Sequence, residues 1–265
     1  MLPNGTWAPL ATGELLLGYA DEADELPVAP IPHLLASNGT FMVYRKLHQN
    51  VATFRAYLDK QVALYSEGKE KLAAKFVGRW QDGTPPELSH NEPNPAIAGD
   101  PTRNTDFTYG ADAEDTSCPI GAHIRRIHPQ DAFGFNGQLI NRRRITRRGL
   151  PYGRFVQEGE PALDNEERGI IFMVLNASLS RQLEFVQQQW IQYDNDSHLG
   201  NDKDVLLGNH GGNGKFVVQG EANLANPPFI CNKLPDFVEL RGGDYFFLPS
   251  ITALGMIAMG LVDPR

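Results

Sequence analysis

Short apolar segments are spaced along the chain, and the first of them predict a strand followed by a helix. Residues 41–47 form a mostly apolar run of β-type composition. Asn50 can cap a helix that follows, and Gly68 is expected to end it. The apolar positions at near-helical spacing in this segment are Val51, Phe54, Leu58, Val62 and Tyr65. A further short helix is predicted over residues 69–77.

The second half of the chain carries a similar series of segments. Residues 139–147 are predicted to form a charged strand, and residues 169–175 a buried one. A helix is expected over residues 178–193, because apolar residues lie along one face of it: Leu179, Leu183, Val186 and Trp190. The pattern closes with a strand over residues 244–248 and a helix over residues 251–261.

Two stretches rich in Gly, Pro, Asn and Asp, residues 78–120 and 197–240, are predicted to be long loop excursions. The remaining order is strand, helix, strand, strand, helix, strand, which is the ferredoxin-like βαββαβ order. It predicts an α+β fold with an antiparallel sheet and helices on one face. Residues 1–37 are expected to be an extended N-terminal arm or linker, and residues 38–265 the domain. No internal repeat is visible, so one such unit is expected.

Composition narrows the class of protein. The chain has 265 residues, of which 41% are hydrophobic and 21% charged, as in ordinary globular proteins. A net charge of −8 argues against a nucleic-acid binder, and the longest apolar runs are too short to span a membrane. Two cysteines make no disulfide framework, and the first residues lack the pattern of a secretory signal. A cytoplasmic location is therefore expected.

One histidine stands out among seven. A lone histidine is usually a surface or structural residue, but His123 follows a tight turn that Pro119 and Gly121 favour. An uncharged imidazole in such a position can ligate iron. His128 is a rival ligand, although a spacing of five residues puts the two rings on different faces of a helix.

Seven arginines lie within a short stretch that begins directly after His123. They allow three interpretations: a solvated face, a basic patch for phosphate or nucleic acid, or a site for a buried dicarboxylate or phosphate. The last fits best, because guanidinium groups pair bidentately with carboxylates and interleaved aromatic residues are missing. The seven are Arg125, Arg126, Arg142, Arg143, Arg144, Arg147 and Arg148.

Two other motifs do not indicate a specific binding site. Asp202 and Asp204 lie in an Asp-rich loop whose spacing does not match an EF-hand. The glycine-rich residues 208–214 do not clearly join a strand to a helix, so a phosphate-binding loop is not indicated.

Five segments match the pattern of one known family: residues 13–19, 38–47, 73–80, 118–126 with 147–153, and 241–249. On these segments the chain resembles the dye-decolorizing peroxidases along its whole length. The resemblance implies a b-type haem with His123 as the axial iron ligand, and Asp204 as the acid that orients this histidine. It also implies that Arg147 stabilises cleavage of the O–O bond of hydrogen peroxide, while a dye or phenol-type molecule is the reductant.

The same resemblance implies further haem contacts. Ile170 and Phe172 match apolar residues on the distal face of the haem, and Arg125 or Arg126 is expected to hold a propionate. No partner beyond peroxide and a small organic reductant is implied, apart from a homo-oligomer or a missing N-terminal half.

One departure from the family pattern leaves alternatives open. The family carries a distal aspartate in a Gly-x-x-Asp-Gly motif, which this sequence lacks, and it has two ferredoxin-like units where one is expected here. The chain therefore resembles the C-terminal half of such an enzyme. A non-catalytic haem-binding module, a half-enzyme that needs an N-terminal partner, and a non-haem anion-binding protein are the alternatives.

Overall fold

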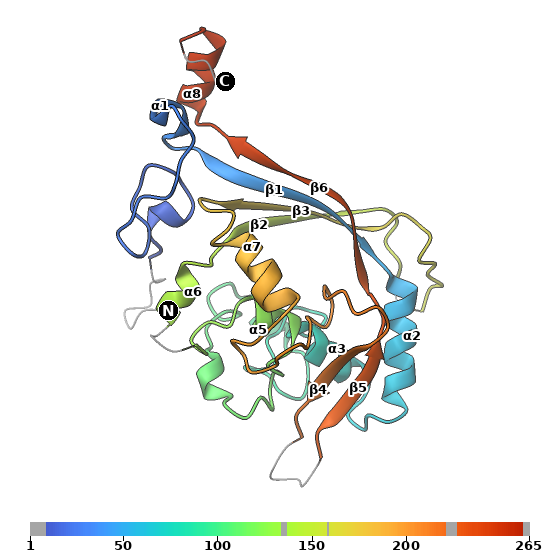
Figure 1. The fold of residues 1–265 in the computed structure, drawn as a ribbon. Coiled ribbons are helices and arrows are strands. Elements are labelled where there is room, and N and C mark those ends of the chain that lie inside the picture. Colours follow the sequence, from blue (N-terminus) through green and yellow to red (C-terminus); the bar gives the residue numbers. More distant parts are fainter. Residues whose placement is uncertain (1–8, 134–136, 158, 221–226, 262–265) are drawn as a thin grey trace.

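The computed structural model describes residues 9–133, 137–157, 159–220 and 227–261. Its centre is a four-stranded antiparallel sheet in the order β2-β3-β1-β6 (Figure 1). The strands are β1 (Thr40–Gln49), β2 (Thr146–Tyr152), β3 (Gly169–Asn176) and β6 (Val238–Leu248).

Two helical segments complete the βαββαβ order. Helix α2 (Val51–Val62) follows β1, while α7 (Leu183–Phe185) follows β3 and continues into a π-helix, η4 (Val186–Ile191). The predicted α+β fold with a ferredoxin-like antiparallel sheet is confirmed. In Figure 1 the sheet lies above the helical layer that contains α5 (His123–Ile127) and α7.

The remaining elements lie between these strands and helices, in the excursions, and near the ends of the described chain. The first excursion contains α4 and η2, and the second contains a hairpin of β4 and β5. The bounds are η1 (Thr12–Glu14), α1 (His33–Ala36), α3 (Lys69–Val77), α4 (Pro95–Ala98), η2 (Tyr109–Ala111), α6 (Gln138–Asn141), β4 (Gly214–Val218), β5 (Phe229–Leu234) and α8 (Ile251–Ala258). No described helix has the length and apolar character that a membrane crossing requires.

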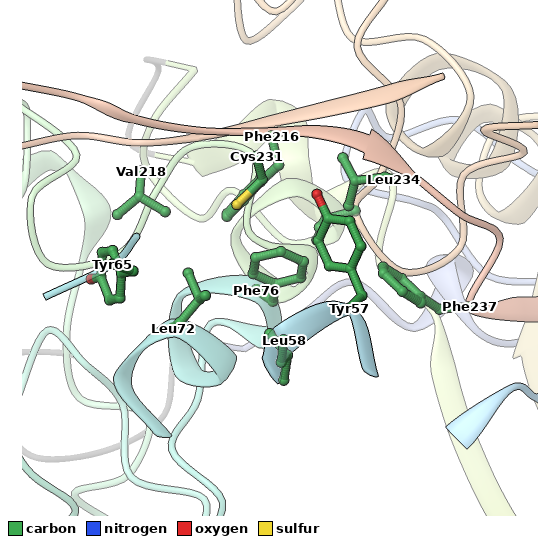
Figure 2. Packing of buried hydrophobic residues seen from close by; sticks show 11 residues of the cluster. Tyr57, Leu58, Tyr65, Leu72, Phe76, Phe216, Val218, Cys231, Leu234 and Phe237 are labelled. Atoms are coloured by element: carbon green, nitrogen blue, oxygen red, sulfur yellow. The ribbon is translucent and has the colours of Figure 1, made fainter. Parts of the chain in front are cut away.

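Buried hydrophobic side chains of helices α2 and α3 and of the β4–β5 hairpin pack together in one cluster, called the lower core (Figure 2). Phe76 lies at its centre with no exposed surface. Its ring centroid is 4.7 Å from that of Phe216 and 6.3 Å from that of Tyr57. This cluster matters for function because it supports the loop that leads from η4 to β4.

Replacing Phe76 with alanine is expected to lower the free energy of unfolding by about 3–5 kcal/mol, since it removes a fully buried ring and leaves a cavity. Urea denaturation of the purified chain measures the loss. The control is Leu64→Ala, whose side chain is 78% exposed, and a change of less than about 0.5 kcal/mol is expected there. Equal effects of the two substitutions would contradict this assignment of the core.

Several predicted boundaries were wrong. The segment predicted as a strand over residues 139–147 begins as helix α6, and its strand, β2, starts only at Thr146. Helix α2 ends at Val62 rather than near Gly68, which instead precedes α3. The Asn50 side chain does not cap α2. The carboxylate of Asp164 does so, accepting hydrogen bonds from the amides of the first turn of the helix.

The described part of the predicted N-terminal arm packs against one end of the sheet. Leu17 is fully buried beside Ala177 and Phe41. Glu14, also fully buried, pairs with Arg181 at 3.0 Å. The domain boundary at residue 37 stays a prediction.

Candidate functional site

His123 is the first residue of α5, which packs tightly against the end of α3. Gly78 ends α3 in the left-handed conformation, with φ of 82°. A Cβ at Gly78 would lie only 3.2 Å from the Cβ of Ile124, so a larger residue would push the two helices apart. Gly121 similarly lies against the ring of Phe216. Gly78 and Gly121 therefore allow α5 to pack closely against its neighbours, and this packing fixes the position of His123.

A buried carboxylate faces His123. Asp204 has no exposed surface, and its two oxygens lie 3.1 and 3.0 Å from Nδ1 of His123. Asp204 also accepts hydrogen bonds from the amides of Leu206 and Leu207, at 3.0 and 2.7 Å. Its own amide donates to the carbonyl of Ile191 at 2.7 Å, which ties the loop to η4. These contacts orient the carboxylate toward the imidazole.

The environment of Asp204 keeps it ionised. Burial alone would raise the pKa of this carboxyl group. The facing imidazole of His123 and the amide of Leu207 outweigh burial and hold the pKa below its ordinary value. An ionised Asp204 accepts the Nδ1 proton of His123, which leaves the lone pair of that ring on Nε2. Within the described residues, no hydrogen bond reaches Nε2, and the His123 side chain is 18% exposed.

The two arginines that follow His123 are both paired inside the protein. Arg125 contacts Asp112 at 3.0 Å and Asp115 at 2.7 Å, and its guanidinium lies over the ring of Tyr109. Arg126 has an ion pair with Asp194 at 3.4 Å.

Arg126 is also held by the backbone of η4 and of the loop that carries Asp204. Its guanidinium donates to the carbonyl oxygens of Trp190 and Asp202. Burial lowers the pKa of Arg126, and the neighbouring Asp194 opposes this effect. Both arginines therefore brace α5 and its surroundings in this structure, and of their donors the buried Nε of Arg125 has no hydrogen-bond partner among the described residues.

The other predicted site residues lie together on one face of the sheet. Strand pairing places Arg147 opposite Val174, which is opposite Val43 in turn. Val43 and Val174 are buried against Leu183 of α7, so this face looks toward the helical layer. Directly opposed residues share a face, and Arg147 therefore lies on it as well.

Phe172 belongs to the next row of the same face. Gly149 is opposite it on one side and Arg45 on the other. Ile170 lies one row further along β3. A Cβ at Gly149 would meet only the Cγ2 atom of Ile170, at 3.4 Å, so the face is open beside Phe172.

Two surface cavities lie elsewhere. One, of about 540 Å³, is lined by Arg143, Phe185 and Trp190 among others, and a second, of about 500 Å³, borders Glu87 and Asp112. Neither is lined by a residue assigned to the haem, although Arg142 and Arg143 of the arginine-rich stretch line the first. The structure thus brings His123 to Asp204, and Arg147 to Phe172 and Ile170, as two separate groups.

Comparison with known proteins relates the chain to an enzyme family. A dye-decolorizing peroxidase of Mycena epipterygia is 31% identical, with 97% of this chain and 53% of the relative covered. The chain is a homologue of the dye-decolorizing peroxidases. The dye-decolorizing peroxidase AauDyP1 of Auricularia auricula-judae is 32% identical over 83% of this chain and 46% of the relative. No protein-family model matches.

The fold agrees with that of the solved peroxidases. An ancestral D-type dye-decolorizing peroxidase superposes with a TM-score of 0.77 at 29% identity, covering 94% of this chain and 56% of that one. A fungal dye-decolorizing peroxidase from Auricularia auricula-judae gives the same TM-score, with 95% and 60% covered. The chain spans about half the length of the curated relatives it matches.

Sequence reasoning missed two parts of the site region. The acidic partners of Arg125 and Arg126 were not foreseen, because Asp112 and Asp194 stand in loops without a motif. The position of Arg45 beside Phe172 was missed as well. The alternation of side chains along β1 would have predicted the sheet face on which Arg45 lies. Its position opposite Phe172 follows only from the pairing of β1 with β3.

Proposed function

We propose that this chain binds haem b through His123 and acts as a dye-decolorizing peroxidase, oxidising dyes or phenol-type reductants with hydrogen peroxide. The observation that carries the proposal is the buried Asp204 carboxylate on Nδ1 of His123. A carboxylate–histidine pair of this kind is typical of imidazoles that ligate a metal, since it fixes the tautomer and raises the basicity of the other nitrogen.

The residues present fit a haem. Nε2 of His123 is free of hydrogen bonds within the described chain, and the His123 side chain is partly exposed. The sheet face with Phe172 is apolar at its centre and carries a glycine beside that ring, as a flat group requires. In this proposal, His123 with its Asp204 partner ligates the iron, and the open apolar sheet face contacts the flat ring of the cofactor.

Each residue has a defined task in the proposal. When bound, the haem would supply the iron that reacts with peroxide and the oxidising equivalents that are passed to the reductant. Asp204 holds the Nδ1 proton and so strengthens Nε2 as an electron donor. Arg147 donates hydrogen bonds to the peroxide oxygens and balances negative charge that develops there. Phe172 and Ile170 exclude water from the reacting atoms.

The role predicted for Arg125 or Arg126 as a propionate ligand is not retained in this proposal. Both guanidiniums already have carboxylate partners. Breaking a buried pair to reach a propionate would leave an unpaired charge inside the protein, which is costly.

Replacing Asp204 with asparagine tests the pairing on which the proposal depends. The amide keeps the shape but loses the negative charge, so haem affinity is expected to fall about 10- to 100-fold. A haem titration followed by absorbance in the Soret region measures it. The control is Asp202→Asn, the same change two residues away, where the Asp202 carboxylate has one ion pair among the described residues, with a half-exposed Lys215. Equal affinities of D204N and the unchanged chain would refute the assigned role.

A second candidate function is a haem-binding module, or a half-enzyme whose distal carboxylate comes from a partner. Two observations favour it: the chain spans about half the length of its relatives, and its sequence contains no Gly-x-x-Asp-Gly. Adding peroxide and a dye to the haem-loaded chain separates the candidates. Dye oxidation supports the peroxidase, whereas haem binding without turnover supports the module or half-enzyme.

A further inference from the structure

Arg45 lies on the same sheet face as the predicted peroxide-side residues. It is opposite Phe172 on β3 and opposite Gly243 on β6. Its guanidinium is held in place by two hydrogen bonds, from Nη1 to the carbonyl of Tyr44 at 3.0 Å and from Nη2 to the hydroxyl of Tyr245 at 2.9 Å. The guanidinium carbon is 4.7 Å from the centroid of the Tyr245 ring. Arg45 is therefore fixed in position before any ligand arrives.

The backbone of β6 is shaped around this side chain. A Cβ at Gly243 would lie 2.5 Å from the carbonyl oxygen of Tyr44, 2.7 Å from Cδ of Arg45 and 2.8 Å from its Nη1. A larger residue at Gly243 would therefore clash with the backbone of β1 and would also displace the arginine side chain. Two strand neighbours, Gly243 and Tyr245, thus position one guanidinium from the adjacent strand.

The charge of Arg45 has no counterpart in the described part of the protein. No carboxylate of the described residues lies within 4.0 Å of its guanidinium. The buried arginines behave differently, since Arg125, Arg126 and Arg181 each have an acidic partner. Two of the five N–H donors of Arg45 are used by Tyr44 and Tyr245, which leaves three for an external acceptor. A guanidinium that is held rigidly, has unused N–H donors and lacks a carboxylate partner is well placed to bind an anion.

Arg45 lies too far from Arg147 for both residues to bind the same peroxide molecule. The two residues stand two strands and one row apart, which corresponds to about 12 Å between their Cα atoms at standard sheet spacings. Hydrogen peroxide is too small to reach both. A larger group that covers Phe172, which lies between them in the sheet, can extend to Arg45.

We infer that Arg45, held by Tyr245 and Gly243, binds a propionate carboxylate of the haem. This inference rests on the proposed function, in that it takes haem as the ligand. It assigns to a strand residue the role that the resemblance suggested for the arginines after His123. Tyr245 acts as a positioning residue, because it touches the guanidinium and not the carboxylate.

A titration of Arg45→Gln with haem and with haem dimethyl ester tests the inference. The ester keeps iron and ring but removes both carboxylate charges. For the unchanged chain, haem is expected to bind about 10- to 100-fold more tightly than the ester. For R45Q this preference is expected to shrink to a few-fold, with the position of the Soret band unchanged. Tyr245→Phe is expected to lose part of the preference.

The matched control is Arg148→Gln. Arg148 is opposite Met173 and so lies on the other face of the sheet, where its guanidinium donates only to the carbonyl of Arg147 among the described residues. R148Q removes the same charge and should keep the full preference for haem over the ester. Thermal melts of R45Q and R148Q verify that both fold, and Arg45→Lys provides a milder variant that retains the charge.

The outcomes separate this inference from the proposed function. Equal preference in R45Q and the unchanged chain, with haem still ligated by His123, would overturn the role of Arg45 alone. That role would also be overturned if R45Q weakened the binding of haem and ester equally. A change only in the affinity for a carboxylated aromatic reductant would overturn it too, since the anion would then belong to the reductant. Absence of saturable haem binding in the unchanged chain would overturn the proposed function first.

Discussion

Replacing His123 with alanine is expected to abolish axial ligation and to weaken haem binding by about 100-fold or more. The reason is direct, because His123 supplies the only ligand in the proposal and Asp204 acts through it. Loss of a metal ligand exceeds the roughly 10- to 100-fold cost that is usual for its supporting carboxylate. Titration of H123A with haem, with the Soret band and the spin state recorded, gives the affinity and the ligation together.

The control for this result is His128→Ala. His128 is the rival ligand in the sequence, five residues further along. Burial lowers its pKa to about 4, so it is a neutral imidazole at physiological pH and chemically able to ligate iron. H128A should retain the affinity and spectrum of the unchanged chain. Free imidazole should partly restore the spectrum of H123A. If H128A loses the histidine-ligated spectrum and H123A keeps it, the ligand has been assigned to the wrong residue.

Replacing Arg147 with glutamine is expected to slow the reaction of the haem-loaded chain with hydrogen peroxide by about 10²–10³-fold. The guanidinium is the charged donor assigned to the peroxide oxygens, and removal of one such donor costs this much in other enzymes. Haem affinity should change little, because Arg147 is exposed on β2 and has no part in ligation. Stopped-flow absorbance against peroxide concentration gives the second-order rate constant.

Two further variants make the result for Arg147 specific. Arg148→Gln removes the neighbouring charge on the opposite face of the sheet and should leave the rate unchanged. Arg147→Lys retains the positive charge but loses the planar guanidinium with its paired N–H donors, so an intermediate rate is expected. If R147Q and R148Q slow the reaction to the same extent, the effect is one of net charge, and the assigned contact is wrong.

Much of the fold follows from local patterns. Apolar runs of β-type composition predicted β1 and β3, and the segment between Gly68 and Gly78 predicted α3 with its bounds. The hairpin of β4 and β5 was missed because its strands lie in a glycine-rich stretch without clear alternation. Strand β2 was placed too early, since polar residues dominate it and only its pairing with β3 defines it.

The site was predictable only where a motif marks it. The pairing of His123 with Asp204 joins residues 81 apart in sequence, and it was expected from the family resemblance rather than from spacing. The contact of Arg45 with Tyr245 spans 200 residues and depends on the register of β1 and β6. No local signal encodes such a contact, because register is fixed by the assembled sheet.

The most direct test of the central claim is a haem titration of the purified chain, with H123A beside it and peroxide added at the end. We expect saturable binding at one haem per chain, a histidine-ligated Soret band that H123A lacks, and a spectral change when peroxide is added. Unsaturable binding, or an identical band in H123A, would contradict this claim.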